Sequence, residues 1–323
     1  MQKMTDSAVV HDMIDGIKYR SQSPCMSAES PLVTIENNSW RDDSRIRDEA
    51  VSALESGRVL YIPDLGFPIE AQEKQFFADA FFRLSAKNIS FDPMTREIRG
   101  LKKSAQTTEQ EIALLAGMMA RYASFSQSLC ESLMGERARW LSVARTSFRP
   151  VEIEGRKSRT VGSDDTLLHV DSFSSRPMAG RRILRVFTNV NPAGKPRVWH
   201  VGEPFEDLAG RFVPRLRKPW PGERAALRML YVTKSYRTLY DHYMLRLHDD
   251  MKGDSTYQRS VPFTRVELAS GATWICFTDQ VSHAALSGQH VLEQTIYCDV
   301  EHMAQPERSP LKVLESMIGR ALV

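Results

Sequence analysis

Apolar side chains follow two different spacings along this chain of 323 residues. In some stretches they recur every three or four positions, which places them on one face of an α-helix. Elsewhere they form short runs bounded by Gly, Pro, Asn or Ser, which is typical of β-strands. The first spacing predicts helices over residues 44–57, 70–86, 108–136 and 307–321. The second predicts strands over 58–63, 140–154, 197–201, 263–268, 272–277 and 290–300, and one strand on each side of the turn at 172–180.

These elements predict a mainly β fold with flanking helices. The strand over 140–154 contains Pro150, which has no backbone N–H for a neighbouring strand, so we expect it at a sheet edge. The three runs between residues 263 and 300 suggest an antiparallel meander. Residues 1–38 show no steady periodicity and predict a loosely ordered N-terminal arm, followed by one domain over 39–323 with helical insertions.

A His-x-Asp pair, His169-Val170-Asp171, closes the strand-like run before the turn. Successive side chains of a strand alternate between its faces, so the imidazole and the carboxylate should point to the same side. With a distant second histidine they would form the two-histidine, one-carboxylate set that holds non-haem Fe(II) with open positions. His283, in TDQVSHAALSG, fits that place. The tripeptide alone is a weak signal, because an aspartate that caps a turn beside a half-buried histidine has the same spacing.

The overall composition narrows the classes of protein that this site can belong to. A net charge of +3 argues against a dedicated nucleic-acid-binding protein. The four cysteines lack the Cys-x-x-Cys spacing of a zinc site, which indicates reduced thiols in a cytosolic protein. We find neither a transmembrane-length apolar run nor the apolar core of a signal peptide, so any membrane contact would be at the surface. The basic and aromatic stretch over 211–237 could meet phosphates or an anionic membrane, or could be an ordinary solvated helix face.

Iron held by three side chains keeps open positions for 2-oxoglutarate, which chelates it through the keto acid, and for dioxygen. That co-substrate also needs a cation or hydroxyl groups in the interior for its distal carboxylate. Arg182 and Arg185 lie in the arginine-rich strand after the turn, on opposite faces, so only one can point inward. Thr166 could add a hydroxyl group. An internal salt bridge is the alternative role for either arginine.

Three segments, HVDSFSSRP from His169, GRRILRVFTNVNP from Gly180 and VWHVGEPF from Val198, resemble the Kdo hydroxylases of Gram-negative bacteria. These Fe(II)/2-oxoglutarate-dependent oxygenases hydroxylate C3 of 3-deoxy-D-manno-oct-2-ulosonic acid (Kdo) in the inner core of lipopolysaccharide, which gives Ko. The resemblance runs from about Ser39 to the C-terminus. It implies a double-stranded β-helix (jelly-roll, cupin-like) fold and an iron triad of His169, Asp171 and His283.

The resemblance also implies a protein on the cytoplasmic face of the inner membrane, where a Kdo-containing lipid A precursor is its partner, with ascorbate as the reductant in vitro. The chain departs from a common pattern of 2-oxoglutarate oxygenases, because Glu293 and Gln294 stand where many carry Arg or Lys, about ten residues after the second histidine. This departure favours a cation from the strand of Arg182 and Arg185.

The sequence offers only positional candidates for contact with the sugar: Arg176, Lys195, Arg197 and Arg211. Two alternative functions stay open at this stage. One is an oxygenase of the same fold that acts on a protein or a small metabolite. The other is a cupin-like module without redox activity that binds a sugar or a lipid.

Overall fold

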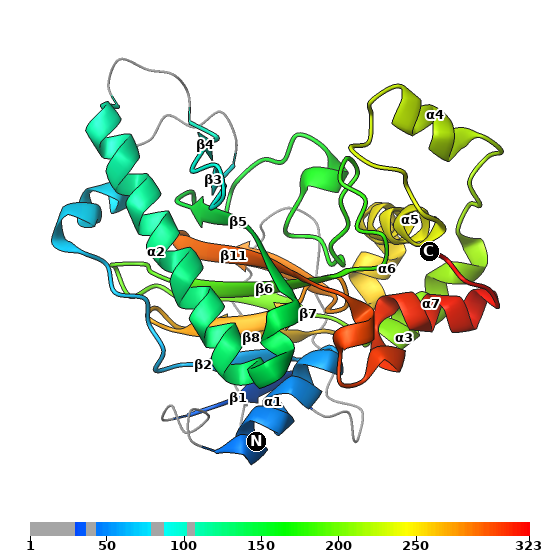
Figure 1. The fold of residues 1–323 in the computed structure, drawn as a ribbon, viewed down its shortest axis with the longest axis horizontal. Coiled ribbons are helices and arrows are strands. Elements are labelled where there is room, and N and C mark those ends of the chain that lie inside the picture. Colours follow the sequence, from blue (N-terminus) through cyan, green and yellow to red (C-terminus); the bar gives the residue numbers. More distant parts are fainter. Residues whose placement is uncertain (1–29, 37–42, 79–86, 102–106) are drawn as a thin grey trace, which may run out of the picture.

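A computed structural model describes residues 30–36, 43–78, 87–101 and 107–323 (Figure 1). Within these residues, eight strands form a large sheet in the order β1-β2-β9-β6-β11-β5-β3-β4, and three form a small sheet in the order β10-β7-β8. The large sheet consists of β1 (Leu32–Thr34), β2 (Val59–Ile62), β3 (Ile89–Phe91), β4 (Ile98–Arg99), β5 (Leu141–Arg149), β6 (Arg182–Asn189), β9 (Thr273–Phe277) and β11 (Val291–Cys298). The small sheet consists of β7 (Arg197–Val201), β8 (Thr264–Leu268) and β10 (His283–Ser287).

The helices are α1 (Ser44–Glu55), α2 (Glu109–Met134), α3 (Phe205–Phe212), α4 (Glu223–Met229), α5 (Leu239–Gly253), α6 (Ser255–Ser260) and α7 (Pro310–Ile318). Helices α1 and α2 lie against the outer face of the large sheet, whereas α3 to α7 gather at one end of the two sheets (Figure 1). The fold is therefore a mixed α/β architecture. The prediction of a mainly β fold was wrong in this respect, because most of the chain between β7 and β8 is helical.

The outer face of the large sheet is covered by α2. A capping box of Thr108 and Glu111 starts this helix, and the hydroxyl of Tyr122, from its buried face, lies 3.2 Å from the carbonyl oxygens of Val186 in β6 and Leu292 in β11. Strand β11 pairs with both β5 and β6 and is buried along its whole length. The buried residues of β11 include Glu293, Gln294 and Thr295, whose polar groups need partners inside the protein.

An aromatic cluster fills the space between the two sheets. The ring of Phe187 from β6 stacks on Trp274 from β9 at 5.2 Å between centroids, and both meet Trp199 from β7 edge to face. These side chains join β6 and β9 of the large sheet to β7 of the small sheet. The interior between the sheets also contains the polar side chains of His169, Asp171 and His283.

Four element predictions need correction. Strand β5 is not at an edge, because it lies between β11 and β3, and Pro150 follows its last residue and so costs no sheet hydrogen bond. Strands β8 and β9 belong to different sheets and so do not form a meander. The chain crosses from the small sheet to the large sheet at Ser270 and Gly271. Residues His283–Ser287, which lie between the strands predicted over 272–277 and 290–300, form a further strand, β10. Within the predicted helix 70–86 the structure has a short 3-10 helix, Ala71–Phe77, and residues 79–86 lie outside the described residues.

The predicted N-terminal arm, 1–38, lies mostly outside the described residues. Its described part includes β1, which pairs in parallel with β2 at the edge of the large sheet. Leu32 and Val33 pack against the apolar core and Ile35 is buried in it, so this segment is part of the domain. No helix among the described residues has the length and apolarity needed to cross a membrane.

Candidate metal centre

His169, Asp171 and His283 meet at one point of the interior, where one ligand atom from each lies within 4.8 Å of the others. His169 and His283 are joined by a pair of backbone hydrogen bonds of 3.1 and 2.9 Å, and the N–H of Asp171 donates to Thr278 at 2.7 Å. The intervening Val170 is fully buried on the opposite side. The predicted alternation of this segment is thus confirmed, although only His169 makes a sheet-like bridge and the segment is extended rather than a regular strand.

The two histidine rings present the same nitrogen to the centre. Nδ1 of His169 lies 2.8 Å from the carbonyl oxygen of Leu167, and Nδ1 of His283 lies 2.9 Å from that of Val281. A carbonyl oxygen can only accept, so each Nδ1 carries the proton and each Nε2 keeps its lone pair. Backbone contacts of this kind orient metal-ligating histidines and set their tautomer.

The electrostatics of the site favour the protonation states that a metal requires. Burial lowers the pKa of His169 and of His283, so both imidazoles are neutral near pH ~7. Burial alone would raise the pKa of Asp171, but the charge of Arg185, the two histidines and a hydrogen bond from Thr278 together outweigh it, and the pKa of this carboxyl is lowered. Two neutral imidazoles and one carboxylate are therefore available together.

Two aromatic contacts hold the histidines from the sides. The indole of Trp199 in β7 stacks on His283, with centroids 5.1 Å apart, and His248 of α5 meets the ring of His169 edge to face at 5.5 Å. Neither residue is among the site residues predicted from the sequence. The alternation along β7 was the available signal for Trp199, whereas nothing in the sequence marks His248, whose position depends on how α5 packs.

A buried chain of alternating charges extends from Asp171. Arg185 lies 3.0 Å from Oδ2 of Asp171 and donates to Glu293 at 2.7 Å, and Glu293 also accepts from Arg149 at 2.7 Å. Of the two arginines Arg182 and Arg185, Arg185 is therefore the one that points inward. Two carboxylates share its charge. Glu293, ten residues after His283, therefore connects Arg149 to Arg185.

Arg182 lies on the opposite face of β6 and is fully buried. Its guanidinium donates to Asp279 and to Gln280, each at 2.7 Å, and lies over the ring of Phe277. Arg182 therefore forms an internal salt bridge, which was the alternative role considered for either arginine. The hydroxyl of Thr166 donates to Asp164 at 2.7 Å, in a local turn before the His-x-Asp pair.

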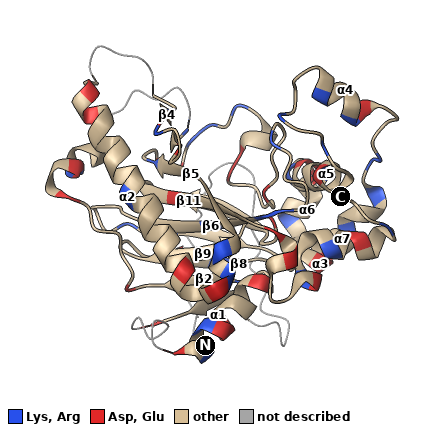
Figure 2. Ribbon diagram, viewed as in Figure 1, with Lys and Arg blue, Asp and Glu red and all other residues tan. Residues whose placement is uncertain are grey.

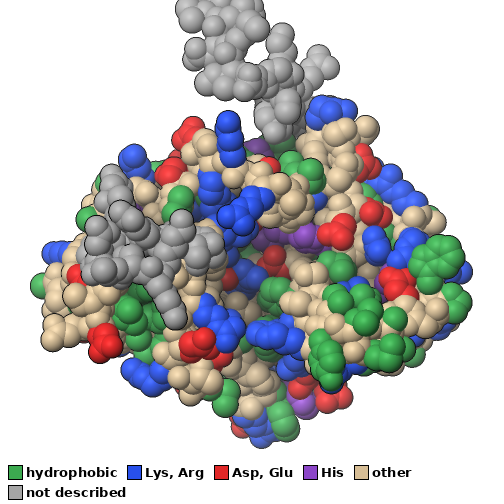
Figure 3. All heavy atoms as spheres, turned by 90° about the horizontal axis from the view of Figure 1, so that it is seen from above, with side chains coloured by type: hydrophobic (Ala, Val, Ile, Leu, Met, Phe, Trp, Pro, Cys, Tyr) green, Lys and Arg blue, Asp and Glu red, His purple; other side chains and the backbone are tan. Residues whose placement is uncertain are grey.

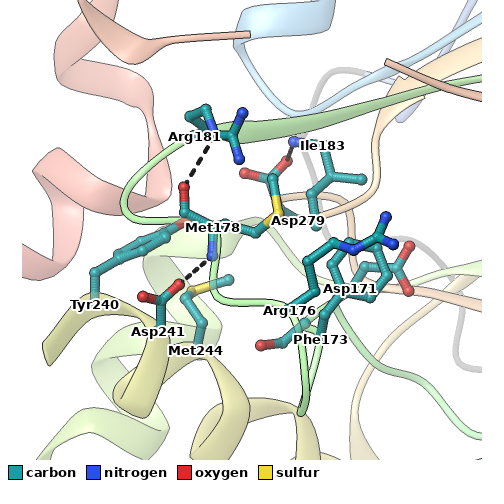
Figure 4. A pocket seen from close by; sticks show the side chains of 11 residues that line it. Asp171, Phe173, Arg176, Met178, Arg181, Ile183, Tyr240, Asp241, Met244 and Asp279 are labelled. Carbon is teal, nitrogen blue, oxygen red and sulfur yellow. Dashed lines mark hydrogen bonds between the residues drawn. The ribbon is translucent and has the colours of Figure 1, made fainter. Parts of the chain in front are cut away.

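The four candidates for sugar contact lie in different surroundings. Arg176 lines a pocket next to Asp171 and Phe173, closed by residues of α5 (Figure 4). Arg197 is buried on β7, and Lys195 is exposed in the turn before β7. Arg211 of α3 donates to Glu203, which precedes this helix, at 2.9 Å. The structure therefore brings Arg176 to the metal ligands and leaves Lys195 and Arg211 in other surroundings.

The face seen in Figure 3 is hollowed near its centre, where histidine, acidic and basic side chains come together. Two histidines and one carboxylate with an open side define the class of site that binds a divalent transition metal such as Fe(II). The fold and the site therefore define a candidate non-haem metal protein.

Comparison with known proteins gives the family. The family model described as 3-deoxy-D-manno-oct-2-ulosonic acid (Kdo) hydroxylase matches residues 37–321, and the chain belongs to this family. A crystal structure of the Kdo hydroxylase KdoO, a non-heme Fe(II) alphaketoglutarate dependent dioxygenase in complex with cobalt(II), is 44% identical with a TM-score of 0.86; the match covers 91% of this chain and 98% of that one. The structure of KdoO in complex with alphaketoglutarate and Fe(III) is 43% identical over the same shares, with a TM-score of 0.85. A search of curated proteins found no match.

Proposed function

We propose that this protein is an Fe(II)/2-oxoglutarate-dependent dioxygenase that hydroxylates Kdo at C3 in a Kdo-containing lipid A precursor, which gives Ko. The observation that carries the proposal is the buried triad of His169, Asp171 and His283 in a chain 43% identical to a Kdo hydroxylase bound to alphaketoglutarate and Fe(III). Family membership supports the substrate class, and the donor set supports the metal.

The finer fold that we propose is a double-stranded β-helix. The chain passes from β5 in the large sheet to the bridge at His169, which pairs with the small sheet, and then to β6 in the large sheet. It continues through β7 and β8 in the small sheet, β9 in the large, β10 in the small and β11 in the large. The switching strands pair antiparallel within each sheet, and such switching between two sheets produces a jelly roll, with the ligand site at one end between them.

The donor set fits Fe(II), because the two imidazoles are held as Nδ1–H tautomers with Nε2 free and the carboxylate keeps its negative charge. Bound iron with 2-oxoglutarate and dioxygen supplies the oxidation of a C–H bond. The protein's own part is to place the substrate carbon near the three ligands and to bind both anionic substrates.

For the distal carboxylate of 2-oxoglutarate we propose Arg197 rather than Arg185. Arg185 already shares its charge with two carboxylates, which hold its pKa above the usual value despite burial. Burial lowers the pKa of Arg197 to about 9, and the positive charge of Arg149 contributes in the same direction. Its Nη1 donates to the carbonyl of Gly288, and its buried Nε, like that of Arg185, has no hydrogen-bond partner among the described residues. The two arginines therefore differ in the carboxylates that pair with Arg185. A bound carboxylate would supply the missing negative charge.

The position of Arg197 also suits that role. It lies two residues before Trp199 on β7, so both side chains point between the sheets, and Trp199 stacks on the metal ligand His283. The strand rise separates the two Cα atoms by about 6.6 Å. Arg197 is therefore within reach of a small dicarboxylate held at the triad.

Arg176 is our candidate for the carboxylate of the sugar. It lies five residues after the metal ligand Asp171, and the two side chains line the same pocket (Figure 4). Asp241 of α5 accepts hydrogen bonds from the N–H groups of Met178 and Ala179, which fixes the turn that carries Arg176. The carboxylate of an anionic sugar beside Asp171 would meet this cation close to the metal ligands.

The direct test of the proposal is mass spectrometry of Kdo-lipid A precursor after incubation with the protein, Fe(II), 2-oxoglutarate and ascorbate. We expect a gain of one oxygen atom, about 16 Da, with succinate formed in equal amount. Omission of 2-oxoglutarate is the control. Succinate without a heavier lipid would indicate an oxygenase of this fold with another substrate, and absence of both products would favour a binding module without redox activity.

The two arginine assignments are tested as a pair, in which each variant is the control of the other. Arg197→Met should raise KM for 2-oxoglutarate roughly 10–100-fold, because a hydrogen bond to a charged group contributes about 1.5–3 kcal/mol, and should leave KM for the Kdo substrate unchanged. Arg176→Met should raise KM for the Kdo substrate and leave KM for 2-oxoglutarate unchanged. Equal effects of Arg197→Met on both constants, or a 2-oxoglutarate effect confined to Arg185→Met, would contradict the assignment of Arg197.

We further propose a cytoplasmic, peripheral location on the inner membrane, since the acceptor is a lipid. Its support is the basic and aromatic character of residues 211–237.

A further inference from the structure

The exposed apolar side chains of this protein are concentrated in one place. Of the thirteen large apolar side chains exposed among the described residues, six fall between residues 220 and 236. We call them the α4 patch: Trp220, Met229, Leu230, Tyr231, Val232 and Tyr236. Tyr231 is 85% exposed and Met229 73%. Scattered apolar residues on a surface need no explanation, but a contiguous group marks a contact with another molecule or a membrane.

The local backbone displays this patch instead of burying it. No residue of α4 is buried. Directly after the helix, Tyr231 has a φ of 56°, a left-handed conformation that ordinarily favours glycine. The N–H of Tyr231 donates to Arg228 and that of Val232 to Leu227, so the turn is held by hydrogen bonds. The largest side chain of the turn is thus fixed in an outward position at a conformational cost.

The surroundings of the patch are strongly basic. Residues 217–237 contain six cations and one acid, Glu223, which is paired with Arg217. The guanidinium of Arg228 lies 5.9 Å from the ring of Tyr231, and that of Arg224 lies 5.2 Å from the ring of Tyr236. Figure 2 shows Lys and Arg around α4, and Figure 3 shows hydrophobic and basic side chains side by side on the edge of the face where α4 lies. Aromatic rings beside cations are the composition of surfaces that enter the headgroup region of anionic bilayers.

The patch is connected to the metal centre through the backbone. The N–H of Lys234 donates to the carbonyl of Ser175 at 2.9 Å, and the guanidinium of Arg237 donates to that of Ser174 at 2.6 Å. Ser174 and Ser175 belong to the segment that links the ligand Asp171 to Arg176. The position of the patch is therefore set by the same loop that leads into the site.

We propose that the α4 patch docks on an anionic lipid bilayer, with its apolar side chains among the headgroups and the flanking cations on the lipid phosphates. This inference deepens the proposed function and rests on it, because docking would bring the loop after Asp171 to the surface from which a lipid-linked sugar projects. Charge complementarity selects lipid as the occupant, since a segment with five net positive charges matches an anionic surface.

The test is co-sedimentation of the full chain with vesicles, which requires neither iron nor turnover. We expect binding to vesicles of phosphatidylethanolamine and phosphatidylglycerol that weakens with salt, and little binding to phosphatidylcholine vesicles. Leu230→Ser/Tyr231→Ser and Arg228→Glu/Lys234→Glu should each reduce vesicle binding by at least about tenfold. Met94→Ser and Arg137→Glu are the matched controls, because both residues are exposed outside the patch, and they should bind as the unchanged protein does.

Turnover assays separate this inference from the proposed function. The two patch variants should lose activity on Kdo-lipid embedded in vesicles and keep it on a deacylated, water-soluble Kdo acceptor. Vesicle binding that depends on the patch, without Kdo hydroxylation, would uphold the docking surface and overturn the proposed function. Hydroxylation with patch variants that bind vesicles normally would overturn the docking surface, as would a patch-dependent dimer that fails to bind vesicles.

Discussion

Replacement of His169 with alanine is expected to abolish both metal binding and 2-oxoglutarate turnover. The variant removes one of three ligand atoms that lie within 4.8 Å of one another, and no other described His, Cys, Asp or Glu forms such a group with the remaining two. Loss of a supporting contact around a metal costs roughly 10–100-fold in affinity or activity, and loss of a ligand itself should exceed that. Metal content after Fe(II) loading and succinate formation are the two measurements.

The control for this experiment is His200→Ala. His200 lies on β7 opposite Ala284, next to His283, but on the other face of the strand from Trp199, where its ring stacks on Phe263. The His200→Ala substitution removes an imidazole from the same pair of strands but leaves the three metal ligands in place. Metal content and turnover should therefore be retained. A His169→Ala protein that binds iron and forms succinate at the normal rate would refute the assigned centre.

The second large effect is expected on stability, from Arg182→Met. This substitution leaves the carboxylate of Asp279 buried without its cationic partner, and breaking a buried ion pair on one side costs about 3–5 kcal/mol. Chemical denaturation should show this loss. KM for 2-oxoglutarate should be unchanged in the folded variant, because Arg182 lies on the opposite face of β6 from Arg185.

The loss should also depend on pH. Burial raises the pKa of Asp279 even with Arg182 present, and removal of the cation raises it further. The pKa of Asp279 in the folded variant is then higher than in the unfolded chain. Between these two pKa values the folded state binds more protons than the unfolded state, so the free energy of unfolding of the variant rises as pH falls through the folded pKa. The deficit against the unchanged protein should therefore shrink toward pH ~5. The double variant Arg182→Met/Asp279→Asn should recover part of the stability, and a deficit that grows on acidification would show that the buried carboxylate is not its cause.

The charge chain around Asp171 explains how a buried carboxylate remains ready for a metal. Oδ1 lies 3.7 Å from Nε2 of His169, and Oδ2 faces Arg185. Arg185 in turn is held by Glu293, itself fixed by Arg149 across the β5–β11 pair. The cation thus keeps the aspartate ionised, and the outer acid keeps the cation in place.

Local sequence patterns predicted much of the secondary structure and the identity of the triad. The helices α1 and α2 begin at residues whose side chains cap them, Asp43 and Thr108, and such signals act within one turn of the chain. The pairing of His169 with Asp171 was equally local, because strand alternation alone sets their common side. The choice of His283 rested first on its place downstream, before the last predicted strand, and then on the family resemblance.

The tertiary structure decided everything that depends on which charges and strands meet. Both arginines of β6 had the same local sequence signal, and only the distant partners Asp279 and Glu293 separate a structural ion pair from a side chain at the metal centre. The same holds for β5, whose neighbours come from β3 and β11, and for His248, which α5 brings to His169. Backbone periodicity and capping are properties of neighbouring residues and can be read along the chain. The energy of a buried charge depends on atoms that lie far apart in sequence, and those atoms meet only when the two sheets and their helices have packed.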